Sequence, residues 1–289
     1  MASPNLAELL RKEQTVYGTL MTCPAAIFTK ALAETGVDFV FIDTEHVPLD
    51  RNELGHMCLA YKSLGIPPLV RIPKADASLA RQAIDAGACG VVAAYMETVE
   101  QVIELKSAVK LKPLQGALMR MALAEPELFK TEHPRTAEEV SRRNSATALV
   151  INVESKTALA NLEKMLAVPG VDSVLVGPHD LSFSLGVPED FESPVFQNAL
   201  KRIFGAARKA GVGAGIHNGM PPGTKGMTTD YAKRWIEEYG CNVYVHGADV
   251  NLFTAQLKRD LSTIRQEGSS GTENGFKRAR VSEQGGSCI

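Results

Sequence analysis

The chain has 289 residues and 45% hydrophobic residues, enough to bury a large core. Its formal net charge of −2 gives no bulk attraction to nucleic acid or to an anionic membrane surface. Aromatic residues make up only 6%, so stacking platforms for single-stranded nucleic acid are not expected either.

Eight short runs rich in valine, isoleucine and leucine are predicted strands. They lie at 16–21, 37–42, 68–72, 90–96, 147–153, 171–177, 212–216 and 242–247. These runs do not alternate strictly between apolar and polar residues, which indicates strands that are covered on both faces. Helical segments are predicted between them, several ending in glycine. They lie at 25–36, 51–65, 78–87, 98–110, 156–168, 193–211 and 229–240.

This alternation of strand and helix is typical of parallel βα units. Eight units in a chain of this length predict an α/β fold, a closed (β/α)8 TIM barrel, for which about 250 residues are usual. An open doubly wound sheet is the alternative, but no G-x-G-x-x-G follows the first predicted strand. We therefore predict one barrel domain over residues 1–265.

Two segments fall outside the regular alternation. Residues 113–145 separate the fourth and fifth predicted strands, and we expect a helical insertion over the barrel mouth. From residue 266 glycine, serine and charged residues dominate without periodicity, which predicts a disordered tail at 266–289.

The expected cellular location follows from three features that the sequence lacks: a cysteine motif, a signal peptide and a membrane span. Its five cysteines include no C-x-x-C pair, which fits a reducing compartment better than a disulfide framework. The first 14 residues contain no apolar signal-peptide core, and no run approaches the roughly 18 apolar residues of a membrane span. We expect a cytoplasmic protein without a membrane partner.

Polar residues follow the predicted strands at the ends where barrel enzymes place their active sites. They are Asp43, Glu45, His46, Arg71, Glu154, His179, Asp180, His217, Asn218, His246 and Asp249. Each has a structural explanation when it is taken alone, such as a turn, a helix cap or a core ion pair. Their convergence on one rim favours a functional site.

The residue types at this rim suit a narrow range of chemistry. Glu154 and Asp180 offer two hard oxygen ligands, the usual protein contribution to a Mg²⁺ site. Arg71 could neutralise an oxyanion beside the ion, and His46 is the obvious general base. Together these groups fit enolate chemistry on a 2-oxo acid. No strand-end lysine is placed for a Schiff base, so an imine-forming aldolase is less favoured.

Several motifs, in order, resemble the HpcH/HpaI aldolase family. They are DTEHVPLD (43–50), VRIP (70–73), IDAGACGVV (84–92), NVES (152–155), VPGVDSVLVGPHDLS (168–182) and HGAD (246–249). The resemblance implies a barrel of the phosphoenolpyruvate/pyruvate type that uses Mg²⁺, or alternatively Mn²⁺ or Co²⁺. It also implies a homo-oligomer, a trimer or a hexamer of paired trimers, that exchanges a terminal helix. Here that helix would be 252–264.

The resemblance also assigns roles to individual residues. His46 matches the catalytic base, Arg71 the group that stabilises the pyruvate oxyanion, and Asp85 the acid that raises the basicity of the histidine. Glu154 and Asp180 match the two metal ligands. Asp43 and Glu45 are expected to order water around the ion and to orient the imidazole.

Two substrate-binding positions depart from the family pattern. Asn152 replaces a glutamine and is one methylene shorter. His179 replaces a small residue, and its imidazole is expected to narrow or polarise the cavity. These changes surround the predicted metal ligands without replacing them, so the metal chemistry is retained and the aldehyde partner is left open.

The leading hypothesis is a metal-dependent class II aldolase that joins pyruvate enolate to an aldehyde, or reverses that reaction on a 4-hydroxy-2-oxo acid. The alternative is oxaloacetate decarboxylation followed by attack of the same enolate on a bulky acceptor, as in macrophomate synthase of this family. A catalytically silent binding protein is disfavoured because every residue next to the predicted metal is retained. A CoA-ester lyase is also less favoured, because the sequence has no basic, phosphate-suited run near the rim.

Overall fold

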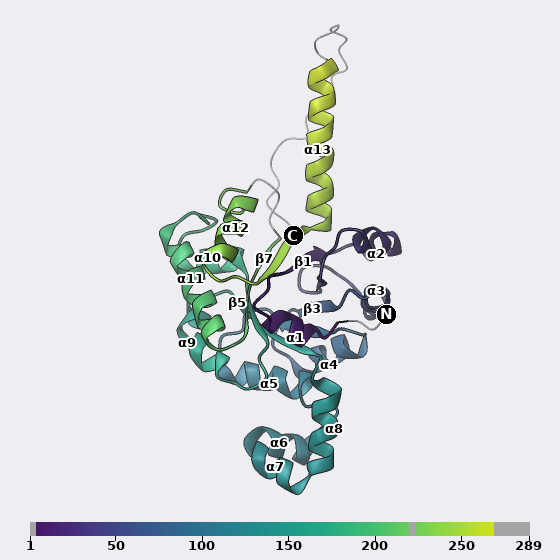
Figure 1. Cartoon of the computed structure of the whole chain (residues 1–289), viewed down its shortest axis with the longest axis vertical. Helices are drawn as coiled ribbons and strands as arrows, with labels where there is room; N and C mark the ends of the chain where they lie inside the picture. Colours follow the sequence, from purple (N-terminus) through teal and green to yellow (C-terminus); the bar gives the residue numbers. More distant parts are fainter. Residues whose placement is uncertain (1–3, 220–223, 269–289) are drawn as a thin grey trace.

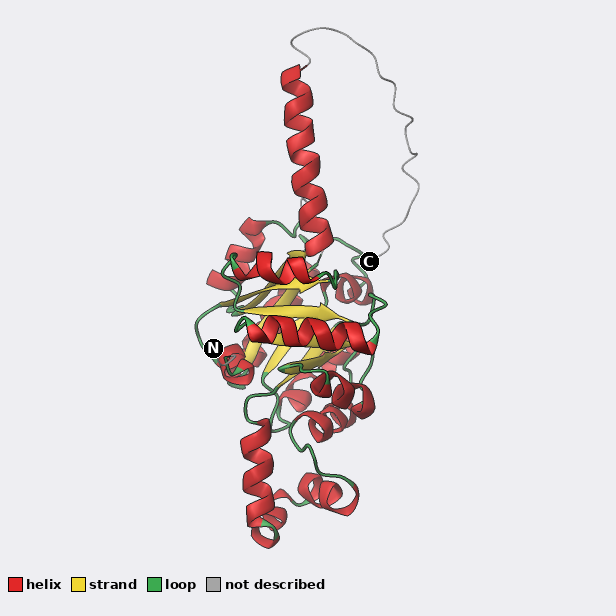
Figure 2. Cartoon of the chain, turned by 90° about the vertical axis from the view of Figure 1, so that its right-hand side faces the viewer, coloured by secondary structure: helices red, strands yellow, loops and turns green. Residues whose placement is uncertain are grey.

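The computed structural model describes residues 4–219 and 224–268. Eight parallel strands close into a barrel in chain order, and helices surround it (Figures 1 and 2). The strands are β1 (Val16–Met21), β2 (Phe39–Asp43), β3 (Pro68–Ile72), β4 (Gly90–Ala93), β5 (Ala148–Val153), β6 (Ser173–Val176), β7 (Gly213–Asn218) and β8 (Val243–Ala248). The predicted (β/α)8 barrel is confirmed.

The helices lie where the sequence predicts them, with short additional helices at α1 and α10. They are α1 (Leu6–Arg11), α2 (Ala26–Ala33), α3 (Arg51–Ser63), α4 (Ala77–Asp85), α5 (Val99–Val109), α6 (Gly116–Ala124), α7 (Pro126–Glu132), α8 (Pro134–Asn144), α9 (Lys156–Leu166), α10 (Pro178–Leu185), α11 (Pro194–Lys209), α12 (Thr229–Glu237) and α13 (Asp249–Gly268). Side-chain caps start several of them, such as Asp50 before α3 and Asp76 before α4.

The strands are largely apolar because both of their faces are buried. Every residue of β2, β3 and β5 is buried. Their outward side chains, such as Val40 and Ile42, join the large core beneath the helices. Their inward side chains, such as Phe41 and Leu69, fill the barrel interior. This packing excludes water from the interior below the strand ends.

Helix α1 closes the N-terminal end of the barrel. Its Leu6, Ala7 and Leu10 side chains are fully buried. The Asn242 side-chain amide donates to the Leu10 carbonyl at 3.1 Å, and a Cβ added to Gly213 would lie 2.5 Å from that same oxygen. Because this end is filled, a ligand can reach the barrel interior only from the C-terminal ends of the strands.

The insertion formed by α6, α7 and α8 is not at the barrel mouth, contrary to the expectation from the sequence. It connects α5 to β5, and a chain that leaves a helix re-enters the barrel at the N-terminal end of the next strand. Figure 1 shows the insertion at one pole of the molecule and α13, which follows the end of β8, at the other. Phe129, Met119 and Leu114 give the insertion a small core of its own.

Helix α13 projects away from the barrel (Figures 1 and 2). It ends at Gly268, so residues 266–268 belong to a helix and not to the predicted tail. The remainder of that prediction, 269–289, lies outside the described residues. Among the described helices, none combines the length and apolar character needed to cross a membrane.

Candidate active site

Arg71 forms the centre of a charged group at the ends of β2 and β3. The strand register pairs Asp43 with Arg71, and their side chains form a double hydrogen bond, with Nε donating at 2.8 Å and Nη2 at 2.6 Å. Both residues are almost completely buried. Burial alone would raise the pKa of Asp43, but the hydrogen bonds and charge of Arg71 outweigh it, so this pKa lies below its usual value. Asp43 is therefore ionised and fixes the guanidinium.

Glu45 links this guanidinium to His46. One Glu45 carboxylate oxygen lies 3.0 Å from Arg71 Nη1 and 3.6 Å from His46 Nε2. Burial raises the pKa of Glu45, although the charge of Arg71 acts in the opposite direction. The His46 side chain is half exposed. The imidazole is therefore accessible to a ligand, and Glu45 is the carboxylate beside it in this chain.

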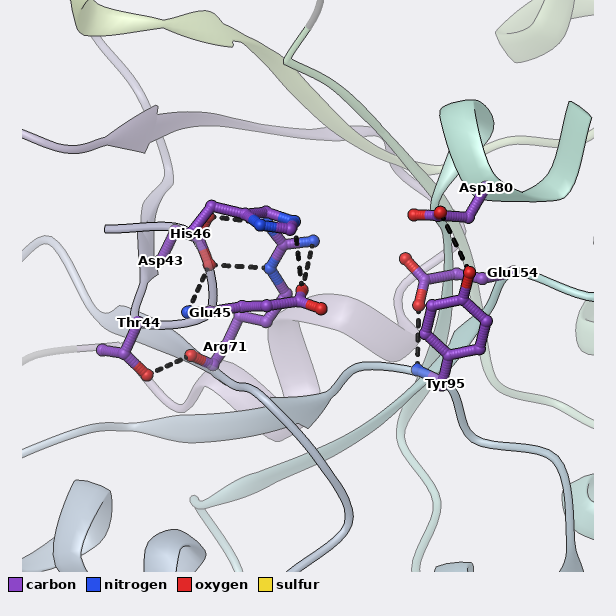
Figure 3. Close-up of polar contacts among 8 residues, drawn as sticks. All are labelled: Asp43, Thr44, Glu45, His46, Arg71, Tyr95, Glu154 and Asp180. Atoms are coloured by element: carbon purple, nitrogen blue, oxygen red, sulfur yellow. Dashed lines mark hydrogen bonds and ion pairs between the residues drawn. The ribbon is translucent and has the colours of Figure 1, made fainter. Parts of the chain in front are cut away.

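The two predicted metal ligands lie across the barrel mouth from this group (Figure 3). Glu154 follows β5 and is 2% exposed, whereas Asp180 stands in the first turn of α10. Tyr95 contacts both of them. Its backbone N–H donates to Glu154 Oε2 at 2.8 Å, and its hydroxyl donates to Asp180 Oδ1 at 2.9 Å. The Arg71 guanidinium and the Glu45 carboxylate point toward this pair in the figure.

The chemistry of this pair fits a hard divalent cation. Burial raises the pKa of Glu154 to about 7, although the hydrogen bond from the Tyr95 backbone and the charge of Arg71 act in the opposite direction. Gly177 leaves room for it, because a Cβ there would lie 2.0 Å from Glu154 Oε1. Within the described residues no group of three or more His, Cys, Asp and Glu side chains could hold a metal. Two carboxylates completed by water and substrate oxygens is the arrangement that Mg²⁺ commonly adopts.

A polar layer inside the barrel forms the floor of the site. Alternate strands supply each interior layer of such a barrel, and the strand register places Leu20, Arg71, Asn152 and His217 in one of them. The Arg71 guanidinium lies 5.5 Å from the ring centre of Phe41, and the His217 ring stacks on the same phenyl at 5.7 Å. Such layers are usually filled by branched apolar side chains.

This layer contains hydrogen-bonding groups that are not satisfied within the described residues. Asn152 is fully buried, and neither its Oδ1 nor its Nδ2 has a partner there. His217 Nε2 is likewise buried without a partner. Burial, followed by the charge of Arg71, lowers the pKa of His217 to about 3, so its imidazole is neutral. Unpaired buried polar groups of this kind call for a functional or solvent partner.

Two predicted site residues do not bring their side chains to the site within one chain. Asp85 ends α4, which runs back from the mouth, and its exposed carboxylate pairs with Lys112 rather than with His46. His179 Nδ1 lies 3.3 Å from Glu189, and its ring packs on Phe183 at 4.9 Å. The imidazole of His179 is therefore held along α10 by Glu189 and Phe183.

Other polar strand-end residues have structural roles. Asp249 is buried and accepts hydrogen bonds from the backbone N–H groups of Thr22 and Cys23, which ties the start of α13 to the end of β1. Asn218 donates to the carbonyl of Met227 and to the Tyr244 hydroxyl. These contacts give Asp249 and Asn218 structural roles, without the need for a functional one.

Tyr95 is the site residue that the sequence analysis missed. The predicted strand at 90–96 included it, but β4 ends at Ala93 and leaves Tyr95 at the rim. Its backbone φ of 51° lies in the left-handed region, which a non-glycine residue rarely adopts. No sequence signal announces that conformation at a tyrosine.

Comparison with known proteins agrees with this geometry. A model of the HpcH/HpaI aldolase/citrate lyase family matches residues 21–216 of the 289. The chain belongs to the HpcH/HpaI aldolase/citrate lyase family. The family predicted from the motifs is thus confirmed, and with it the class of enzyme, a carbon–carbon lyase.

Relatives match over almost the whole chain. The 2-keto-3-deoxy-L-rhamnonate aldolase of Klebsiella pneumoniae is 29% identical over 273 residues, which cover 94% of this chain and 97% of the relative. A crystal structure of an HpcH/HpaI aldolase from Desulfitobacterium hafniense has a TM-score of 0.74 at 26% identity, covering 90% of this chain and 96% of that chain. Macrophomate synthase has a TM-score of 0.73 at 25% identity, with coverages of 93% and 92%.

Proposed function

We propose that this protein is a divalent-metal-dependent aldolase that makes or breaks a carbon–carbon bond between pyruvate enolate and an aldehyde. The observation that carries the proposal is the arrangement of Figure 3, in which Arg71 and His46 face the carboxylates of Glu154 and Asp180 across the barrel mouth. The named activity of the Klebsiella relative, 2-keto-3-deoxy-L-rhamnonate aldolase, supports a 2-oxo acid substrate.

Glu154 and Asp180 would hold the ion, which we propose is Mg²⁺, Mn²⁺ or Co²⁺. When bound, such an ion supplies Lewis-acid stabilisation of negative charge on the oxygens of a 2-oxo acid. Arg71 would stabilise the same charge from the opposite side, because Asp43 holds its guanidinium in place before the substrate binds. The backbone N–H of His179 at the start of α10 would bind the substrate carboxylate.

In the cleavage direction His46 takes the proton from the 4-hydroxyl group, directly or through one water. The electrons of the C3–C4 bond then pass to C3, which gives the aldehyde and pyruvate enolate, and protonation at C3 releases pyruvate. Glu45 would stabilise the protonated imidazole because its carboxylate lies beside His46 Nε2. The synthetic direction reverses these steps with the same groups.

Oxaloacetate decarboxylation remains the second candidate, because it yields the same enolate and because macrophomate synthase shares the fold over most of both chains. An insertion over the barrel mouth or an imidazole in the cavity would favour this reaction, but neither reaches the site. The 113–145 insertion lies at the pole of the molecule opposite α13, and the His179 side chain is held by Glu189 and Phe183. The simple aldol reaction is therefore the first choice.

Asp85 and the oligomer belong to the same proposal. Within one chain the Asp85 carboxylate pairs with Lys112 at the end of α4, away from His46. It can act on the histidine only if another copy of the chain brings it there. We therefore propose a homo-oligomer, a trimer or hexamer, in which Asp85 is supplied in trans. We propose the cytoplasm as the location of the protein.

A product screen tests the proposal. Pyruvate or oxaloacetate would be incubated with Mg²⁺ and a panel of aldehydes, and the products would be identified by mass spectrometry. We expect 4-hydroxy-2-oxo acids from pyruvate, lost in Glu154→Ala and Asp180→Ala. Turnover of oxaloacetate alone would favour the second candidate, and full activity of the metal-stripped double variant would refute both.

A further inference from the structure

Tyr95 contacts both proposed metal ligands through different groups. Its backbone N–H holds Glu154 Oε2 and its hydroxyl holds Asp180 Oδ1, at 2.8 Å and 2.9 Å. The three residues come from different parts of the barrel, since Tyr95 follows β4, Glu154 follows β5 and Asp180 follows β6. One residue therefore connects two carboxylates whose separation the strands alone do not fix (Figure 3).

The backbone of Tyr95 is strained in the conformation that makes these contacts. A φ of 51° lies in the left-handed region, which is unfavourable for a non-glycine residue. Neighbouring hydrogen bonds hold it there. Ala94 N–H donates to the Ile72 carbonyl, Met96 N–H donates to the Asn152 carbonyl, and the Gln101 side chain accepts from Glu97 N–H. Strain that the surroundings maintain at a site rim points to a functional role.

We propose that Tyr95 is the positioning residue of the metal site, which fixes Glu154 and Asp180 at the separation that a divalent ion requires. This inference rests on the proposed metal-dependent function. A carboxylate oxygen has two lone pairs, so Asp180 Oδ1 can accept the phenol hydrogen and still coordinate an ion. Hydrogen-bond partners of this kind orient metal ligands, and removing one typically weakens metal affinity 10- to 100-fold.

Tyr95→Phe tests the hydroxyl, because it keeps the ring and the backbone N–H. We expect this variant to bind Mn²⁺ about 10-fold more weakly than the unmodified protein. The measurement is a titration of metal-free protein followed by the paramagnetic resonance of free Mn²⁺. Turnover should reach half of its maximum at a correspondingly higher Mn²⁺ concentration, because Tyr95 acts through the ligands and not on the substrate.

Tyr17→Phe is the matched control. Tyr17 is as exposed as Tyr95, 47% against 46%, but lies near the N-terminal end of β1. Its Mn²⁺ affinity should be unchanged, and thermal unfolding with a chelator should show both variants folded. A Tyr95→Phe affinity within twofold of the unmodified protein would overturn the positioning role while leaving the metal-dependent function intact. If the unmodified protein bound no Mn²⁺, both would fall.

Discussion

Glu154 gives the site a dependence on pH at the scale of a single residue. Its pKa is raised by burial from the usual 4.5 to about 7, so in the metal-free protein it is largely protonated below that pH. An incoming ion must displace this proton, so apparent Mn²⁺ affinity should fall by up to about tenfold per unit as the pH drops below 7.

Calorimetry in two buffers of different ionisation enthalpy measures that proton. We expect about one proton released per Mn²⁺ at pH 6 and almost none at pH 8.5. The folded protein binds the extra proton between about 4.5 and 7, so the unfolding free energy of the metal-free protein should decline as pH rises through this window. Affinity that does not vary with pH would contradict this account of Glu154.

His217 should show opposite effects on stability and activity. Replacing it with leucine removes a buried Nε2 that lacks a partner among the described residues. The free energy of unfolding of His217→Leu, measured by urea denaturation, should therefore rise by roughly 1 kcal/mol. The same change makes the floor beside Arg71 apolar, and we expect about a tenfold loss in kcat/KM. His56→Leu on the exposed face of α3 is the control, with both quantities near their original values. Lower stability and unchanged activity in His217→Leu would show a purely structural histidine.

At the scale of elements, the turn from β6 into α10 leaves the space that the Glu154 carboxylate occupies. A Cβ at Gly177 would lie 2.0 Å from Glu154 Oε1, so Gly177→Ala should displace the carboxylate and abolish measurable Mn²⁺ binding. Gly205→Ala in α11, where a Cβ would meet nothing within 4 Å, is the matched control and should bind normally. Normal Mn²⁺ binding by both variants would show that Gly177 is not needed to place Glu154.

The same scale shows how far the sequence could predict the structure. Largely apolar runs such as 68–72 predicted buried strands because the barrel interior and the helices cover both faces of each strand. The position of 113–145 was wrong, although the topology determines it, because a segment that follows a helix lies at the far end of the barrel. Arg71 and Glu154 were predictable because parallel strands bring their ends to one rim. The direction of the His179 side chain depends on its packing with Phe183 and Glu189 in the folded chain. The φ of Tyr95 is held by hydrogen bonds of its neighbours to Ile72 and Asn152, which are distant in sequence.

At the scale of the whole molecule, α13 presents an apolar stripe that the single chain leaves exposed. The stripe consists of Val250, Phe253, Leu257, Leu261 and Ile264. Their spacing of three and four residues places them on one face of the helix. We expect this face to pack against another copy of the chain, so Phe253→Glu with Leu257→Glu should reduce the molar mass seen by light scattering. Lys258→Glu, on the same helix, should leave the mass unchanged.

Complementation between inactive variants tests whether Asp85 acts between copies. Asp85→Ala and His46→Ala should each be inactive alone. Mixed oligomers, formed by co-expression, should recover part of the activity because some interfaces then contain both native residues. Without recovery, and with an active Asp85→Ala variant, Asp85 would have no part in the reaction.

The central claim is that this site forms pyruvate enolate with a bound divalent ion, and one measurement needs no knowledge of the aldehyde. Proton NMR in D₂O follows the exchange of the pyruvate methyl hydrogens for deuterium. We predict exchange by the Mg²⁺- or Mn²⁺-loaded protein that stops on chelation and is absent from Glu154→Gln. If the metal-loaded protein did not exchange these hydrogens, or if exchange continued unchanged after chelation, the account would be contradicted.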